Sequence, residues 1–414
     1  MNTALTKRVV ITGLGTISPP GNNIRQFWDS LCAAKPCIGP IGDRWEKTYK
    51  VFPNEAREWI GGQVKDYDPV RYFNKRELQF LDLFSQFALI AAEEAVSDAG
   101  LEITDANRDN AAVILGTSTG GDESRDEASY RFFCEKQRVP NFTIVRTMAS
   151  AAASHVSIKL GITGPTYTVQ STCASATHAI GQAFWLIRQG VADIAISGGT
   201  ETLPSLGLFK GWQAMRILAP DTCRPFSRNR KGLVLGEGAG ILVLESLEHA
   251  RARGAKIYAE ITGFGMSSDA MDIVAPSQRG PIAAMKMALK CAGYNPDEID
   301  YLNAHGTGTP SNDKMETSAI KSVFGKHADT LAVSSTKSMH GHALGASGAL
   351  ESIATILAVQ SDIVPPTINF TEKDSECDLN LVTNEARSMV VNKALNNSFG
   401  FGGLNGVLTF SKFQ

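Results

Sequence analysis

The sequence predicts an α/β fold, in which short buried strands alternate with helices along the whole chain. Three apolar runs, each followed by a cluster of small residues, are the clearest predicted strands: Arg8–Ile11, Ala112–Leu115 and Ile194–Ile196. Apolar residues spaced three and four apart predict helices over Leu78–Ser97, Ala174–Arg188 and Ala349–Val359. The two patterns alternate over 414 residues, a length that suits two or three domains.

Two short internal repeats predict that the α/β unit is duplicated. Val169–Cys173 is similar to Val333–Lys337, and Ile11–Gly15 is similar to Ile261–Gly265, in the same order along the chain. The boundary then falls near residue 255, with an N-terminal half of residues 1–255 and a C-terminal half of residues 256–414. Matches this short also arise by chance, so the possibility that the chain is not duplicated stays open. Duplication would bring equivalent strand-to-helix loops to one central cleft, where open α/β sheets bind ligands.

Composition excludes several functional classes. With 40 Lys and Arg against 42 Asp and Glu, the chain has too little net charge to bind nucleic acid through bulk electrostatics. No apolar run approaches the roughly 20 residues of a membrane span, and only Val9–Ile11 follow Lys7 and Arg8, so no targeting segment is expected. Seven cysteines are scattered singly, which is typical of a reducing compartment. A soluble, cytoplasmic protein is therefore expected.

Cys173 is the first candidate for catalysis. It follows a predicted strand and precedes a helical segment that begins with the small residues Ala174–Ala176. A thiol at a helix N-terminus lies at the positive end of the helix dipole, which favours the nucleophilic thiolate. A buried structural cysteine is the alternative, and the sequence around Cys173 does not by itself decide between the two.

Two histidine-containing segments in the second half supply groups that a thiol nucleophile would need. His305 lies in the glycine-rich segment Asn303–Thr309, and Lys337, His340 and His342 lie on the loop that repeats the cysteine loop. Neutral imidazoles can donate hydrogen bonds to a developing oxyanion or carboxylate. Metal binding is the competing use, but His340 and His342 are two residues apart without an acidic partner, so no metal is expected.

Three further glycine-rich segments carry weaker signals. Asn397–Gly403 can offer backbone donors to an oxyanion, with the apolar ring of Phe401 as a gate that controls access to the site. The alternative is that this segment is an ordinary tight turn. Gly116–Gly120 fits the G-x-S-x-G pattern of serine hydrolases, with Ser118 as nucleophile, although such patterns are common in glycine-rich chains. Gly13–Gly15 lacks the third glycine of a dinucleotide-binding motif, so no nucleotide or nicotinamide cofactor is expected.

In combination, these segments resemble the β-ketoacyl-[acyl-carrier-protein] synthases of the thiolase-like superfamily, in particular synthase II of dissociated fatty acid and polyketide systems. The segments that match in order and spacing are Ser171–His178, Asn303–Thr309, Lys337–Gly348 and Asn397–Gly403. The resemblance covers essentially the whole chain. It implies a duplicated thiolase-like fold of five layers, α-β-α-β-α, and a dimer whose acyl pockets lie against the two-fold interface.

The resemblance also implies a decarboxylative condensation that needs neither a metal nor an organic cofactor. An acyl group would pass from an acyl carrier protein to the cysteine, and malonyl on a second carrier protein would lose CO2 and attack it to give a 3-oxoacyl product. The resemblance implies that Cys173 is the nucleophile, that His305 and His342 are the histidine pair, and that Lys337 pairs with Glu351. It also implies an oxyanion hole and a gate for malonyl entry, formed by Cys173, Phe401 and Phe399.

Several positions depart from the housekeeping synthase II. Thr172 stands where that enzyme commonly has Ala, His340 stands where the family often has Thr, and Thr119 replaces a bulky aliphatic residue that limits the acyl pocket. The resemblance places Trp212 and Ala151 in that pocket beside Thr119. These departures are closer to specialised ketosynthases, such as those of nodulation-factor and polyene pathways, and housekeeping fatty acid elongation stays the alternative.

The predicted docking surface for acidic carrier proteins is basic and consists of Lys75, Arg76 and Arg216. Gln79 and Phe80 stand where further basic residues would be expected, which predicts a weaker patch or one that a partner chain completes. A homodimer and a heterodimer with a chain-length-factor homologue both stay open. A non-catalytic chain-length factor is disfavoured because such proteins usually lack the nucleophile. A thiolase is disfavoured because it would need a second catalytic cysteine near the C-terminus, and the loop Phe399–Gly403 contains none.

Overall fold

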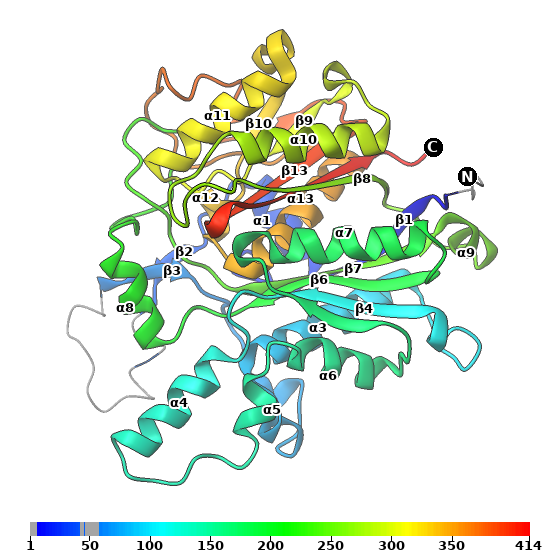
Figure 1. Cartoon of the computed structure of the whole chain (residues 1–414), viewed down its shortest axis with the longest axis vertical. Helices are drawn as coiled ribbons and strands as arrows, with labels where there is room; N and C mark the ends of the chain where they lie inside the picture. The colour runs from blue at the N-terminus through cyan, green and yellow to red at the C-terminus, as the bar shows by residue number, and fades with distance from the viewer. Residues whose placement is uncertain (1–5, 42–44, 46–57) are drawn as a thin grey trace.

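A mixed sheet of ten strands runs through the described part of the chain, which comprises residues 6–41, 45 and 58–414 of the computed structural model (Figure 1). Its strands, in the order in which they lie side by side, are β10 (Ala332–Ser334), β9 (Tyr301–Asn303), β13 (Lys393–Gly400), β14 (Leu404–Ser411), β8 (Ala259–Ser268), β1 (Val9–Ile17), β7 (Gly238–Ser246), β6 (Ile194–Glu201), β4 (Ala111–Gly116) and β5 (Thr166–Val169). Two small sheets pair β2 (Ile38–Pro40) with β3 (Ile60–Gly62) and β11 (Ile363–Val364) with β12 (Arg387–Ser388).

The order of the strands is the same in the two halves of the large sheet. Counted outward from the middle, one half runs β1, β7, β6, β4 and β5, and the other runs β8, β14, β13, β9 and β10. β1 and β8 meet in the middle as an antiparallel pair, in which Val9–Ile11 lie opposite Ala259–Ile261. The repeat Ile11–Gly15 and Ile261–Gly265 lies in β1 and β8. The repeat Val169–Cys173 and Val333–Lys337 covers the ends of β5 and β10 and the loops that follow them. We therefore propose that residues 1–255 and 256–414 are two copies of one α/β unit.

The helices form three layers that alternate with the two halves of the sheet (Figure 1). α7 (Ser175–Arg188) and α13 (Ser347–Ser361) form the middle layer and contact strands of both halves. The outer layers contain α3 (Leu83–Ala99) and α6 (Ala151–Leu160) on one side, and α10 (Arg279–Ala292) and α11 (Pro310–Phe324) on the other. The predicted α/β fold with five layers is confirmed. The remaining α-helices described are α1 (Ile24–Cys32), α4 (Asp122–Phe133), α5 (Thr143–Thr147), α8 (Leu206–Ala214), α9 (Leu247–Ala252) and α12 (Lys337–His340).

The first strand is longer than predicted, because the small residues that follow its apolar run stay in the strand. β1 continues through Gly13 and Gly15 to Ile17. A Cβ atom at Gly13 would lie 2.1 Å from the carbonyl oxygen of Ala95, and one at Gly15 would lie 2.0 Å from that of Ala91. These glycines therefore let α3 pack directly on the strand instead of turning the chain. β6 likewise continues through the glycine pair that follows its apolar run.

The first predicted helix starts later than expected. The apolar spacing suggested Leu78 as its first residue, but α3 begins at Leu83. Asp82 caps this helix by accepting a hydrogen bond from the N–H of Phe84 at 3.3 Å, and residues 77–79 form a separate 3-10 turn. The other two predicted helices agree with α7 and α13 to within two residues at each end.

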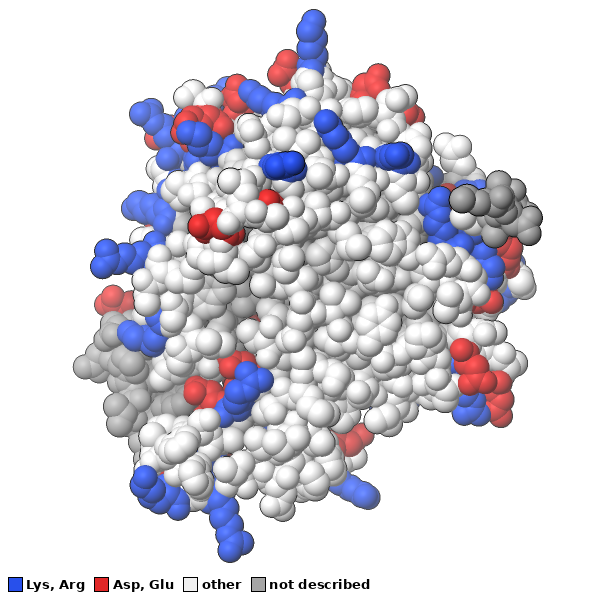
Figure 2. Space-filling model, in the orientation of Figure 1, with Lys and Arg blue, Asp and Glu red and all other residues white. Residues whose placement is uncertain are grey.

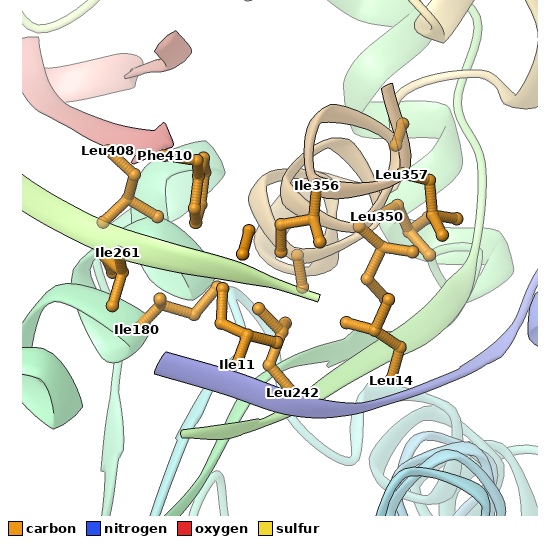
Figure 3. Packing of buried hydrophobic residues seen from close by; sticks show 14 of the residues in the cluster. Ile11, Leu14, Ile180, Leu242, Ile261, Leu350, Ile356, Leu357, Leu408 and Phe410 are labelled. Carbon is orange, nitrogen blue, oxygen red and sulfur yellow. The ribbon is translucent and has the colours of Figure 1, made fainter. Parts of the chain in front are cut away.

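The largest apolar core lies around α13, between the two halves of the sheet (Figure 3). Leu350 of α13 lies in one cluster with Ile11 and Leu242 from the first half and with Ile261 and Phe410 from the second. The first thirteen residues of α13 are all buried, so this helix is fixed on every side. Within the described ranges, no helix is both long enough and apolar enough to cross a membrane.

Candidate active site

Cys173 lies in the tight connection between β5 and α7. A single 3-10 turn, Thr172–Ala174, joins the strand to the helix, and Cys173 is 6% exposed. Gly116 of the neighbouring strand β4 permits this close packing, because a Cβ atom there would lie 2.4 Å from the backbone nitrogen of Ala176. The thiol is therefore held at the N-terminus of α7, where the sequence placed it.

Burial raises the pKa of the Cys173 thiol to about 11, although the charge of Lys337 and the backbone N–H groups of Phe401 and Cys173 lower it. The thiol is therefore protonated at neutral pH. This differs from the expected thiolate, because the loss of hydration outweighs the helix dipole and the nearby cation. A reaction at this sulfur must also remove its proton.

Two histidines from the second half of the chain lie beside Cys173. His305 follows β9, and His342 lies between α12 and α13. The sulfur of Cys173 and one ring nitrogen each of His305 and His342 all lie within 4.8 Å of one another. The imidazole rings stand edge to face, with their centroids 5.3 Å apart. The fold thus brings together the thiol of one half and the two imidazoles of the other.

Each imidazole carries its proton on Nε2. The backbone N–H of Leu344 donates to Nδ1 of His342 at 3.2 Å, and Nε2 of His342 has no hydrogen-bond partner among the described residues. Nδ1 of His305 lies 3.3 Å from Nζ of Lys337, a cation that can only donate. Burial and then the charge of Lys337 hold the pKa of both imidazoles well below the usual value. Both rings are therefore neutral Nε2–H donors at neutral pH.

Lys337 and Glu351 form an ion pair with no solvent exposure at either side chain. Nζ of Lys337 contacts Oε1 of Glu351 and donates to the backbone carbonyl of His305 at 2.7 Å. Burial raises the pKa of Glu351 to about 7, and the charge of Lys337 opposes this rise. The ion pair therefore fixes His305 through both its ring and its backbone.

The candidate groups line one cavity of about 350 Å³, a size typical of small-molecule sites. The predicted site residues in its wall are Cys173, His305, His342, Phe399, Phe401 and Trp212. The ring of Phe401 stacks on that of Trp212, with centroids 5.7 Å apart. The backbone N–H groups of Phe401 and Cys173 lie close enough to the thiol to lower its pKa. The cavity thus presents a thiol, two backbone donors and two imidazole donors to the same small volume.

The other predicted site residues do not line this cavity. Thr119 donates its hydroxyl to Glu201 at 2.7 Å, and Ala151 packs in the core at the start of α6. Their place in an acyl pocket stays a prediction. The three predicted docking residues are all exposed: Lys75, Arg76 and Arg216. Their contact with a carrier protein also stays a prediction.

Ser118 and His340, which the sequence also singled out, make hydrogen bonds away from the cysteine–histidine site. Ser118 donates to the backbone carbonyl of Thr172 at 3.0 Å, and within the described ranges no hydrogen bond joins it to a histidine. A serine hydrolase needs such a base beside its nucleophile. His340 is buried, with Nε2 at 3.1 Å from the hydroxyl of Thr336, and it does not line the cavity.

Two buried carboxylates that were not predicted hold the loops of the site. Glu201 accepts hydrogen bonds from several groups of residues 117–119 and from the N–H of Gly345 at 3.2 Å. Glu316 accepts from the N–H of His305 at 2.8 Å and from that of the next residue at 2.7 Å. Glu201 ends the buried strand β6, and an acidic residue at the end of an apolar run is the signal that identifies it.

Two groups of atoms are candidates for ligand binding beyond the substrate. Cys173, His305 and His342 together have the donor atoms of a three-ligand metal site, and the sequence predicts no metal there. Separately, seven buried side-chain oxygens have no hydrogen-bond partner in the described part of the chain, and four of them are amide or carboxylate oxygens: Asn303 Oδ1, Asn396 Oδ1, Asn397 Oδ1 and Glu351 Oε2. Oxygens of this type suit water or a hard cation.

Two family models match the chain, the N-terminal domain of β-ketoacyl synthases over residues 6–250 and their C-terminal domain over residues 258–371. Together with the five-layered fold and the cysteine–histidine site, these matches define a condensing enzyme with a thiolase-like fold. The chain belongs to the β-ketoacyl synthase family, within its synthase II-like branch. It is an acyltransferase, a 3-oxoacyl-[acyl-carrier-protein] synthase.

Relatives and solved structures agree over nearly the full length. Nodulation protein E of Rhizobium sp. (strain N33) is 46% identical over 406 residues, which are 98% of this chain and 99% of the relative. 3-Oxoacyl-[acyl-carrier-protein] synthase 2 of Synechocystis sp. (strain ATCC 27184 / PCC 6803 / Kazusa) is 43% identical over 417 aligned positions, 99% of each chain.

The ishigamide ketosynthase/chain length factor superposes with a TM-score of 0.92 at 35% identity, covering 99% of this chain and 100% of that one. A type II polyketide ketosynthase in complex with its acyl-carrier protein, AntDE:AntF, superposes with a TM-score of 0.88 at 31% identity, with the same coverage.

Proposed function

We propose that this protein catalyses a decarboxylative Claisen condensation between an acyl group on Cys173 and malonyl-acyl carrier protein. The observation that carries the proposal is the convergence of one thiol, two backbone N–H donors and two neutral imidazoles on a single cavity. The product is a 3-oxoacyl-acyl carrier protein and CO2. A relative of similar length, 3-oxoacyl-[acyl-carrier-protein] synthase 2, supports the same chemistry.

In the first half-reaction, Cys173 attacks the thioester of an acyl carrier protein. The S–C bond to the enzyme forms, the bond to the phosphopantetheine sulfur breaks, and the cysteine proton goes to that leaving thiolate. The N–H groups of Cys173 and Phe401 hold the oxyanion of the tetrahedral intermediate, and each donor of this type contributes about 3 kcal/mol in comparable sites. The raised pKa of the thiol makes this proton transfer part of the step.

In the second half-reaction, malonyl on a carrier protein enters the cavity. The Nε2–H groups of His305 and His342 donate to its thioester carbonyl, so that loss of CO2 leaves an enolate held by two hydrogen bonds. The enolate carbon attacks the acyl carbon on Cys173, the C–S bond to the enzyme breaks, and the leaving cysteine thiolate takes up a proton from solvent. Neutral imidazoles suit this role because a donor is needed and no net charge has to be buried. Lys337 and Glu351 act by positioning His305.

The proposed pathway is a specialised type II fatty acid or polyketide pathway, and housekeeping fatty acid elongation is the alternative. The similarity to nodulation protein E and to a ketosynthase/chain length factor supports the specialised assignment. The proposed acyl pocket includes Thr119, in place of a bulky aliphatic residue, and the small Ala151, and such side chains would leave room for a longer acyl chain. A non-catalytic chain-length factor is disfavoured by the intact cysteine–histidine site.

The proposed partners are an acyl carrier protein and a second ketosynthase chain, identical or homologous. A ketosynthase neighbour has been solved in complex with its acyl-carrier protein. β5 is an edge strand of the sheet and can pair with another chain, and Ile144 and Ile158 on nearby helices are 74% and 76% exposed. Figure 2 shows a face whose charged side chains lie mainly at its periphery, which leaves an uncharged middle available for association.

The assignment is tested by substituting the nucleophile. Wild-type protein mixed with acyl-carrier protein and malonyl-carrier protein should gain the acyl mass on Cys173 and form the 3-oxoacyl product. Cys173→Ala should gain no acyl mass and form no product while keeping its circular dichroism. Cys37→Ala is the matched control, because Cys37 is also buried and does not line the cavity. Elongation by Cys173→Ala would overturn the assignment. Mass spectrometry of acyl groups bound to the purified protein would distinguish the two pathways.

A further inference from the structure

Thr172, the residue directly before the nucleophile, has a backbone conformation that threonine rarely adopts. Its φ angle is +51°, and a β-branched side chain at positive φ is strongly disfavoured. Glycine or asparagine would fit this conformation with less strain. Threonine at such a position indicates that its side chain has a use that outweighs the strain.

The side chain of Thr172 reaches across to the loop that carries the gate residue. Its Oγ1 donates to the backbone carbonyl oxygen of Phe401 at 3.2 Å. The two segments touch closely, because a Cβ atom at Gly400 would lie 2.1 Å from Oγ1 of Thr172. This contact joins the turn around the nucleophile to the segment 400–403, two parts of the chain that are more than 200 residues apart.

Two contacts hold Phe401 itself, and a third holds the next residue, Gly402. Thr172 binds the carbonyl of Phe401, Trp212 stacks on its ring, and the N–H of Gly402 donates to the carbonyl of Ile273 at 2.9 Å. Gly402 has a φ angle of +79°, a conformation suited to a hinge. With its carbonyl fixed by Thr172, Phe401 keeps its own N–H beside the thiol of Cys173, whose pKa that N–H lowers.

We propose that the Thr172 hydroxyl is a positioning group that latches the segment 400–403 in the conformation with a complete oxyanion hole. This inference rests on the proposed function, because it assigns the latched state to the first half-reaction. Entry of malonyl past the Phe401 ring requires the latch to open. Thr172 therefore favours acylation of Cys173 and slows the exchange to the open state that the second half-reaction uses.

The test removes the hydroxyl while keeping the shape of the side chain. Thr172→Val keeps the β-branch and the backbone strain but cannot donate, Thr172→Ala also lacks the donor, and Thr172→Ser retains it. Each variant is assayed in single turnovers for acylation of Cys173 by acyl-carrier protein, and separately for decarboxylation of malonyl-carrier protein. Folding is checked by thermal melting. Ser118→Ala is the matched control, since Ser118 bonds to the carbonyl of Thr172 and not to the gate loop.

The expected result is a change in the ratio of the two rates. Thr172→Val and Thr172→Ala should acylate Cys173 more slowly by on the order of fivefold, which is the usual effect of one neutral hydrogen bond, while their decarboxylation rate is unchanged or higher. Thr172→Ser should stay within twofold of wild type in both rates, and Ser118→Ala should leave their ratio unchanged.

Two other results would overturn the latch. The first is acylation at the wild-type rate in either folded variant that lacks the hydroxyl, and the second is an equal slowing of both half-reactions. If only one of Thr172→Val and Thr172→Ala folds, that variant decides. Failure of the proposed function gives a different result, because the wild-type protein itself would then take up no acyl group on Cys173.

Discussion

The imidazole rings of His305 and His342 stand edge to face, with their centroids 5.3 Å apart. This arrangement lets both Nε2–H groups approach the same point in the cavity without stacking the rings. Because Nδ1 of each ring has its own neighbour, Leu344 for His342 and Lys337 for His305, neither ring needs to change tautomer when substrate binds. The pair is thus already arranged as donors before any carbonyl oxygen arrives, which is the condition for electrostatic stabilisation without reorganisation.

Because the two histidines donate only to the malonyl thioester, we expect their loss to slow decarboxylation and to spare acylation of Cys173. His342→Ala should lower the rate of malonyl decarboxylation by roughly 100-fold to 1000-fold, the usual loss for one donor to a developing oxyanion. Acylation of Cys173 should remain within a few fold of wild type, since its oxyanion is held by backbone groups. The two rates are measured by CO2 release and by intact-protein mass. His340→Thr serves as control because His340 does not line the cavity. If His342→Ala lost both rates equally, the assignment would be contradicted.

The buried ion pair of Lys337 and Glu351 predicts a strong double-mutant coupling. Lys337→Met leaves Glu351 in a site closed to water, where it must either carry an unpaired charge or take up a proton without a hydrogen-bond partner, and the expected loss in the free energy of unfolding is about 3–5 kcal/mol. The double variant Lys337→Met/Glu351→Leu should recover most of this stability, because no unpaired charge remains. It should not recover decarboxylation, since His305 has lost its positioning cation.

Urea unfolding of the two single variants and the double variant measures this coupling. The exposed ion pair of Lys314 and Glu376 is the matched control, and its removal should leave stability almost unchanged. Additive losses at Lys337 and Glu351, or full activity of the double variant, would count against the positioning role.

Much of the fold could be predicted from the sequence, because apolar periodicity and internal repetition are local signals. The predicted strands and helices are of the right type, and the four segments that carry the family resemblance lie together around one cavity. The glycines themselves were misplaced: Gly13 and Gly15 lie inside β1. A close contact between a strand and a helix leaves the same glycine pattern in sequence as a turn, and only the packing partner, α3, distinguishes the two.

The electrostatics of the site could not be predicted. The position of Cys173 at a helix start was visible in sequence, but its raised pKa depends on burial by segments from both halves. Glu201 and Glu316 were missed for a similar reason, since their partners are backbone N–H groups of distant loops, which no residue pattern specifies. Thr119 and Ala151 were assigned through resemblance alone, and in the single chain they do not line the cavity.

Buried neutral histidines predict that the protein loses stability in mild acid. Burial, and then the charge of Lys337, lower the pKa of His340 to about 3. In the unfolded chain the pKa of a histidine is about 6.5. Between these values the unfolded state binds a proton that the folded state does not, so stability is retained above pH 6.5 and falls as the pH drops below it.

His340→Thr tests this dependence. Each such histidine contributes a slope of up to about 1.4 kcal/mol per pH unit, so the variant should show a shallower fall in the free energy of unfolding between pH 6 and pH 4. The slopes are compared, rather than the absolute stabilities, because the substitution also changes core packing. Identical slopes for the two proteins would show that His340 titrates alike in both states.

The exposed basic residues predict a carrier-protein interface that salt weakens. Charge reversal at Lys75, Arg76 or Arg216 should raise KM for the carrier-protein substrate by roughly fivefold to tenfold with little change in kcat, because surface charges act mainly on association. The effect should shrink as ionic strength rises from 0.05 M to 0.5 M, where screening shortens the range of the interaction. Lys286→Glu on the outer helix α10 is the matched control, since Lys286 is also exposed. A rise in KM for this control equal to that at the three predicted positions would indicate a general effect of net charge in place of a docking site.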